Sequence, residues 1–157
     1  MARCVPIDES FFATAPESHE RTWVVPQSAE EFWADFIDRP LHWTHGLRIR
    51  WTSARPFGVG TTRHVGILGL IQADEHFFAW EEGRRCGFYF TNANLPVFRS
   101  FGEFYDVEPI DAGTCRFTWR LAAEPAPMGK AMTPVTRVLL ASLFRDTDRH
   151  VRSLAAA

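Results

Sequence analysis

The sequence predicts an α+β fold in which a curved antiparallel sheet of about six or seven strands wraps around a long C-terminal helix, with two short helices after the first strand. Three observations lead to this fold. A capped amphipathic segment follows an early strand-like run, alternating apolar and polar residues fill the middle of the chain, and an unbroken helical pattern occupies residues 133–154. Turn residues separate the alternating runs, so neighbouring strands are expected to be antiparallel.

The chain length fits one domain preceded by an arm. A sequence of 157 residues lies within the range of a single domain. Residues 1–18 are predicted to form an extended N-terminal arm, in which two adjacent phenylalanines provide an apolar anchor and Pro16 interrupts regular structure. Residues 19–157 are predicted to form the domain itself, with a first strand at about residues 19–25.

A capping box marks the start of the first helix. Ser28 suits the N-cap position, and Glu31 lies three residues later, where its side chain can return to the cap. Pro40, which suits the first position of a helix, and Gly46, which suits the position after its end, then predict a second short helical turn. The first helix is expected to end near Asp38, and its apolar residues recur at helical spacing: Phe32, Trp33, Phe36 and Ile37.

The middle of the chain shows the period of two that half-buried strands have. Apolar side chains alternate with arginine and threonine in residues 47–52. The segment PFGVGTTR at residues 56–63 supplies two glycines for a hairpin, and no Gly-Lys-Ser or Gly-Lys-Thr follows, which argues against a phosphate-binding loop. Further strands are predicted at residues 61–68, 71–81, 84–91, 98–108 and 114–122.

The C-terminal segment carries the signals of one long helix. Thr133 suits an N-cap, Pro134 suits the first helical position, and no helix-breaking residue occurs before Leu154. Arginine and aspartate supply the polar side of this helix. Its apolar residues lie together on the other side and are expected to face the sheet: Val135, Leu139, Leu140, Leu143, Phe144 and Val151.

Composition and charge narrow the function classes. The 14 Phe and 6 Trp residues either fill an ordinary core or line a cavity. A formal net charge of −2 argues against nucleic acid or an anionic membrane as the main partner. The apolar stretches are too short to span a bilayer, so no stable membrane insertion is expected and a cytoplasmic location is predicted. The three cysteines lack the spacing of a disulfide framework or zinc site, and neither a metal nor a cofactor is predicted.

The order of these elements is that of the helix-grip fold, and four segments occur in it at a characteristic spacing: PQSAEEFW at residues 26–33, PFGVGTTR at 56–63, Glu75 with WEEGR at 80–84, and EFYDVEP at 103–109 before Gly113 and Thr114. In these segments the chain resembles the SRPBCC or START-like superfamily, specifically its bacterial polyketide cyclase/dehydrase and lipid-transport branch. The resemblance covers about residues 19–154. It implies a cavity between the concave face of the sheet and the long helix, and a hydrophobic ligand such as a lipid or a polyketide or other aromatic molecule.

Strand alternation supplies candidate ligand-binding residues for such a cavity, and Phe144 would project into it from the long helix. The candidate wall residues either contact a ligand or simply pack against the helix: Trp51, Phe88, Phe90, Phe117, Trp119 and Phe144. The polar candidates, Arg63, Glu75, Glu103 and Tyr105, lie within strands, where an inward-facing charge is costly unless it is paired. Arg63 is therefore expected to pair with one of the two glutamates, either as a structural ion pair or as part of a ligand site.

Three functions remain open from the sequence. Binding of a hydrophobic small molecule, for transport or sensing, is favoured. The alternative is a cyclase or dehydratase that uses the same cavity, with His64, His76, Glu103 and Tyr105 as candidates for proton transfer. A protein-interaction module is the third, and a homodimer is left open. His42 could share a metal with a second histidine three residues later, but no third ligand lies at a recognisable spacing.

Overall fold

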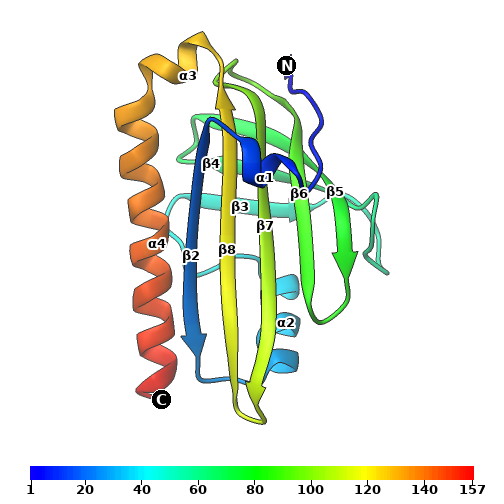
Figure 1. The fold of residues 1–157 in the computed structure, drawn as a ribbon, viewed down its shortest axis with the longest axis vertical. Coiled ribbons are helices and arrows are strands. Elements are labelled where there is room, and N and C mark those ends of the chain that lie inside the picture. The colour runs from blue at the N-terminus through cyan, green and yellow to red at the C-terminus, as the bar shows by residue number, and fades with distance from the viewer.

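The computed structural model describes all 157 residues and shows one antiparallel sheet with a long helix beside it (Figure 1). The strands follow one another along the sheet from β3 to β8, and β2 completes it by pairing with β8. The helices are α1 (Phe11–Thr14), α2 (Ala29–Asp38), α3 (Pro127–Ala131) and α4 (Thr133–Ala155). The strands are β1 (Ala2–Arg3), β2 (Glu17–Val25), β3 (Leu47–Trp51), β4 (Thr62–Ile67), β5 (Ile71–Glu81), β6 (Arg85–Ala93), β7 (Phe98–Asp111) and β8 (Thr114–Pro125).

The sheet has an outer and an inner face. Figure 1 shows α1 in front of the long strands and α2 behind them. Irregular register within the β5–β6 and β7–β8 pairs marks bulges, which bend strands and increase their twist. The helix-grip arrangement predicted from the sequence is therefore confirmed. No helix of the structure combines the length and the apolar character needed to cross a membrane.

The capping box predicted for the first helix is present. The Ser28 hydroxyl accepts a hydrogen bond from the Glu31 backbone N–H at 3.2 Å, and the Glu31 carboxylate accepts one from the Ser28 N–H at 3.2 Å. The second short helix is absent, and residues 39–46 form successive turns instead. Leu41 adopts a left-handed conformation with φ 50°, which interrupts helical propagation and is accompanied by burial of its side chain.

The N-terminal arm lies on the outer face of the sheet. Its strand β1 pairs with β6, and the Val5 N–H donates to the Arg99 carbonyl oxygen at 2.7 Å. The Phe12 ring packs edge to face on Phe104, with 5.8 Å between the ring centres. The arm thus covers residues of β7 that point away from the inner core.

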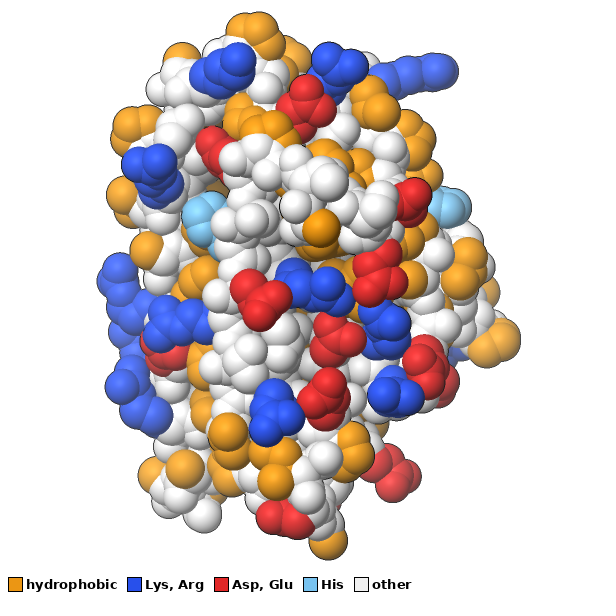
Figure 2. Space-filling view, viewed as in Figure 1, with side chains coloured by type: hydrophobic (Ala, Val, Ile, Leu, Met, Phe, Trp, Pro, Cys, Tyr) orange, Lys and Arg blue, Asp and Glu red, His pale blue; other side chains and the backbone are white.

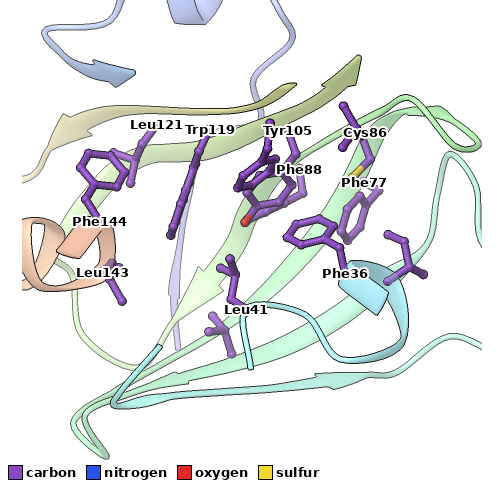
Figure 3. Close-up of a cluster of buried hydrophobic side chains, with 14 of the residues drawn as sticks. Phe36, Leu41, Phe77, Cys86, Phe88, Tyr105, Trp119, Leu121, Leu143 and Phe144 are labelled. Carbon is purple, nitrogen blue, oxygen red and sulfur yellow. The ribbon is translucent and has the colours of Figure 1, made fainter. Parts of the chain in front are cut away.

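The inner core lies between the concave face of the sheet, α2 and α4. Its largest side chains are aromatic and contact one another across elements, as with Phe36 and Tyr105 at 4.8 Å and Trp119 and Phe144 at 5.4 Å between ring centres (Figure 3). Aromatic residues stabilise a core by burying apolar surface and by the edge-to-face contacts that aromatic pairs favour.

The two halves of α4 are held differently. In the C-terminal half, Asp148 accepts hydrogen bonds from Trp23 Nε1 at 2.6 Å and Arg21 Nη2 at 2.9 Å. Thr147 accepts one from Trp43 Nε1 at 2.9 Å, and Asp146 accepts one from the His45 backbone N–H at 2.8 Å. Residues 134–142 make no side-chain hydrogen bond to the sheet. The N-terminal half therefore rests on the sheet through apolar contacts alone.

The backbone of α3 at Gly129 packs closely against the backbone at Val97. A Cβ atom at this position would lie 1.9 Å from the Val97 carbonyl oxygen, which already accepts a hydrogen bond from the Ala126 N–H at 2.9 Å. We expect Gly129→Ala to lower the free energy of unfolding by about 1–3 kcal/mol, because the backbone must move apart. Urea denaturation measures this. Gly58→Ala is the control, since nothing lies within 4 Å of its added Cβ, and equal effects of the two substitutions would contradict the close packing.

Candidate functional site

A cavity of about 90 Å³ lies between the concave face of the sheet and the N-terminal half of α4. Of the 23 residues that line it, 16 are hydrophobic. They come from the strands β3 to β8, from the turn that carries Leu41, and from Leu139, Leu140 and Leu143 of α4. The polar residues lie in two groups, one at the inner end of the cavity and one near the surface.

The outer group lies at the seam between β2 and α4. Glu17, His19 and Thr136 are half-buried and Arg137 is exposed, yet all four line the cavity. In Figure 2, a histidine and side chains of both charges flank the upper part of this seam. The cavity therefore opens to solvent between the edge strand and the helix.

The inner group contains a buried ion pair. Arg63 on β4 and Glu75 on β5 are direct cross-strand partners, and Arg63 Nε donates a hydrogen bond to Glu75 Oε2. Their side chains are only 2% and 3% exposed. The Arg63 guanidinium lies over the rings of Phe88 at 4.4 Å and Phe77 at 5.1 Å. Burial disfavours the charged guanidinium, but the adjacent Glu75 carboxylate outweighs this cost and raises the pKa of Arg63. Burial also raises the pKa of Glu75, against the attraction of Arg63 and the hydrogen bond from it.

A second carboxyl lies beside this pair. Tyr105 Oη and Trp119 Nε1 both donate to Oε2 of Glu103, the latter at 2.9 Å. Glu103 and Tyr105 are two residues apart on β7 and therefore share the inner face, and Trp119 is the β8 partner of Tyr105. Burial raises the pKa of Glu103 to about 7, although the two hydrogen bonds oppose the shift. Glu103 can therefore gain or lose a proton near neutral pH.

Each of the two carboxyl groups keeps one oxygen free for the cavity. The buried side-chain polar atoms without a hydrogen bond are Arg85 Nε and Asn92 Oδ1, and neither belongs to this site. Oε1 of Glu75, Oε1 of Glu103 and the two Nη atoms of Arg63 make no hydrogen bond within the protein, so they are accessible rather than enclosed. Because all three residues line the cavity, these oxygens and the guanidinium N–H groups are available to a molecule inside it.

The structure separates the predicted ligand-binding residues into two sets. Trp119 and Phe144 pack against each other (Figure 3). The rings of Phe117 and Phe36 lie 5.5 Å apart, and Trp51 stacks on Phe57 at 4.3 Å between ring centres. Aromatic side chains of α2, of α4 and of the loop after β3 fill this part of the concave face, so these four predicted residues pack in the core and do not line the cavity. Six do line it: Arg63, Glu75, Phe88, Phe90, Glu103 and Tyr105.

The two candidate catalytic histidines lie on the outer face of the sheet. His64 alternates with Arg63 along β4, and its ring contacts Asp74 at 2.7 Å and Gln72 at 2.9 Å. The hydrogen bond with Asp74 raises the pKa of His64. The His76 ring lies 5.4 Å from that of Tyr89. Neither histidine lines the cavity, which leaves Glu103 and Tyr105 as the proton-transfer candidates at its inner end.

The remaining positions are the histidines of the turn at residues 39–46, considered above as metal ligands, and the leucines that line the cavity. His42 contacts Asp35 at 3.0 Å and His45 contacts Asp146 at 2.9 Å, so the two imidazoles have separate partners. The sequence does not predict that Leu41 lines the cavity, because no sequence pattern indicates a leucine in the left-handed conformation. For the leucines of α4, helical spacing predicts an apolar face, and this spacing is the signal from which their place in the cavity wall can be inferred.

The buried ion pair of Arg63 and Glu75 leads to a prediction about the stability of the protein. The sequence left open which glutamate partners Arg63, and the structure identifies Glu75. We expect Glu75→Gln to lower the free energy of unfolding by about 3–5 kcal/mol, because it leaves a buried guanidinium uncompensated. The matched control is Glu108→Gln, which removes an exposed ion pair with Arg116 and is expected to cost less than about 1 kcal/mol. A comparable loss in both variants, measured by urea denaturation, would place Arg63 and Glu75 in water.

The raised pKa of Glu103 predicts that the stability of the protein depends on pH. A folded-state pKa of about 7, above the ordinary value of 4.5, means that the folded protein retains a proton that the unfolded chain releases. Stability from this group is fully present below pH 4.5 and is lost as the pH rises through about 7. Relative to Glu103→Gln, the wild type should therefore lose about 3 kcal/mol between pH 4.5 and pH 8. If the free energies of unfolding of the two proteins change in parallel with pH over this range, the pKa of Glu103 is not raised by folding.

Comparison with known proteins agrees with the fold. Residues 20–156 match the family model described as polyketide cyclase / dehydrase and lipid transport. Uncharacterized proteins of Mycobacterium tuberculosis and Mycobacterium bovis are each 35% identical over 155 residues, covering 97% of this chain and 92% of the relative.

A START superfamily protein from Mycobacterium smegmatis superposes with a TM-score of 0.62 at 14% identity, over 87% of this chain and 98% of that one. A major latex-like protein from Panax ginseng gives 0.57 at 18% identity, over 86% and 97%. These two structures share the fold, and the sequence match over nearly the whole chain shows that it belongs to the polyketide cyclase/dehydrase and lipid-transport family.

Proposed function

We propose that this protein binds a hydrophobic small molecule, such as a lipid or a polyketide or other aromatic compound, inside the cavity beside α4. The observation that carries the proposal is a mainly apolar cavity that ends in carboxyl oxygens without protein partners. Apolar walls bind by removing ligand surface from water, at about 25 cal/mol per Å². The few polar atoms at the inner end would fix the orientation of the ligand.

The size of the cavity limits the ligand. Its volume of about 90 Å³ is well below the roughly 300–1,000 Å³ of drug-sized sites. A single ring or a slender acyl chain suits this space without rearrangement. A larger ligand requires the N-terminal half of α4 to move outward, and this half has no side-chain hydrogen bond to the sheet that would oppose such a movement.

Substitutions on α4 test where the ligand binds. Leu140 lines the cavity, whereas Val138 on the same helix is 69% exposed. We expect Leu140→Trp to weaken binding of propylbenzene, a ligand with a single ring, by at least about ten-fold, because the indole occupies ligand space or overpacks the site at a cost of about 1–3 kcal/mol. Val138→Trp should leave binding unchanged. Calorimetry measures both, and equal affinities in the two variants would move the site elsewhere.

A second candidate function rests on Glu103. A carboxyl with a pKa of about 7, hydrogen-bonded to Tyr105 and facing an apolar cavity, has the properties of a general acid or base. A cyclase or dehydratase would use it to move a proton on a ligand that the cavity holds in one conformer. If a poly-β-ketone is turned over, Glu103→Gln should lower the rate by about 100-fold or more without loss of fold. Recovery of the ligand unchanged after incubation with the wild type would favour a carrier or sensor.

A further inference from the structure

The segment formed by α3 and the N-terminal half of α4 has basic residues and no acidic ones. Residues 126–145 include three basic residues and neither an aspartate nor a glutamate. Lys130, Arg137 and Arg145 are exposed, and none of them has a carboxylate within salt-bridge distance. In the C-terminal half of α4, by contrast, Arg149 lies 3.6 Å from an aspartate three residues earlier. The positive charge of the N-terminal half therefore faces solvent without a partner in the chain.

Apolar side chains fill the rest of the outward side of this segment. Val135 and Val138 are 57% and 69% exposed. Figure 2 shows hydrophobic and basic side chains along the upper left edge of the molecule, over this part of α4. Together with the three basic residues, the exposed apolar residues form what we call the α3–α4 surface: Pro127, Met128, Ala131, Pro134, Val135, Val138 and Ala141.

The α3–α4 surface lies beside the opening of the cavity. Thr136 and Arg137 line the cavity at its opening, and Leu140 in the next turn belongs to its wall. This half of α4 is thus apolar on its inner and outer sides, and a helix that is apolar all round is normally covered on all sides. Glu17 also lines the opening, but it belongs to β2. A partner that covers the outer side of the helix would lie next to the opening.

The charge of the α3–α4 surface distinguishes between possible partners. A second copy that packed the same surface against this one about a two-fold axis would bring the cations of both copies together with no carboxylate between them, which is unfavourable. A bilayer with anionic lipids supplies negative charge at its surface and apolar material beneath it, and so matches exposed valines beside exposed arginines. The net charge of −2 is an average over the whole chain and does not describe this surface.

We propose that the α3–α4 surface docks reversibly on a bilayer that contains anionic lipids. Its exposed valines and methionine lie among the lipid head groups, and its basic residues lie beside lipid phosphates. The docking is peripheral, because no helix of the structure has the length and apolar character to cross a membrane. This inference adds a partner to the proposed ligand binding and stands on separate observations. In the docked orientation the opening of the cavity lies next to the bilayer, so an apolar molecule can enter with little exposure to water.

Co-sedimentation with lipid vesicles tests the proposal. Vesicles of phosphatidylcholine with about one-third phosphatidylglycerol have a negative surface potential, which vesicles of phosphatidylcholine alone lack. We expect the wild type to bind the mixed vesicles at least about ten-fold more tightly than the neutral ones. Added salt should weaken this binding, because it screens the attraction between exposed charges.

Variants assign the binding to the α3–α4 surface. Lys130→Gln combined with Arg145→Gln should weaken binding to the mixed vesicles by at least about ten-fold, because each basic residue near an anionic surface contributes about five-fold. Val138→Trp should strengthen it, because an indole favours the membrane interface. Arg3→Gln is the matched control and should bind as the wild type does, because it removes an exposed charge from the N-terminal arm on the outer face of the sheet.

The outcomes separate docking from the other partners and from the proposed function. Equal binding of the wild type to both kinds of vesicle, or to neither, would overturn the proposal. An equal loss in Arg3→Gln and in the double variant would also overturn it. A dimer that sedimentation velocity detects in the wild type and not in Val138→Asp would assign the α3–α4 surface to a second copy instead. Binding of propylbenzene in the cavity is measured separately by calorimetry, so a failure of docking leaves the proposed function standing.

Discussion

The ion pair of Arg63 and Glu75 constrains much of the surrounding structure. Two charged side chains on the concave face can remain paired there only if β4 and β5 hold their register, because a slip of one residue in either strand would carry its member of the pair to the outer face. Removing two charges from water costs several kcal/mol per ion, and close pairing with further favourable contacts must offset that cost. Aromatic rings on neighbouring strands supply those contacts. The pair thereby fixes the polar end of the cavity in an otherwise apolar interior, and the carboxyl of Glu103 acquires its properties from this setting.

Most of the fold could be predicted from local patterns, and much of the site could not. The capping box at Ser28, the alternation in the strands and the unbroken pattern before Leu154 report backbone conformation directly, and the structure confirms the elements they predict. Alternation also identified which strand residues face inward. It could not say which inward residues would be covered by α2, because that depends on tertiary packing. Phe117 and Trp119 therefore belong to the core, although their strand positions are equivalent to those of cavity residues.

The turn at residues 39–46 shows a different limit of sequence reasoning. Proline and glycine at its two ends are compatible with a helical turn, and propensity alone predicts one. The left-handed conformation of Leu41 is uncommon for a residue with a branched side chain, and it persists because the surrounding structure supports it. The buried side chain of Leu41 forms part of the cavity wall. Tertiary contacts here outweigh local preference, and no single-sequence pattern reports such contacts.

The uneven attachment of α4 affects how fast molecules can pass between the cavity and solvent. Polar contacts from Trp23, Trp43 and the turn preceding β3 hold the C-terminal half, whereas the half over the cavity rests on leucines. Local opening of the N-terminal turns breaks few of the interactions that determine global unfolding, so its free energy lies well below that of the whole domain. For a ligand bound as proposed, we expect the residence time to depend on this half of the helix more than on the rest of the domain.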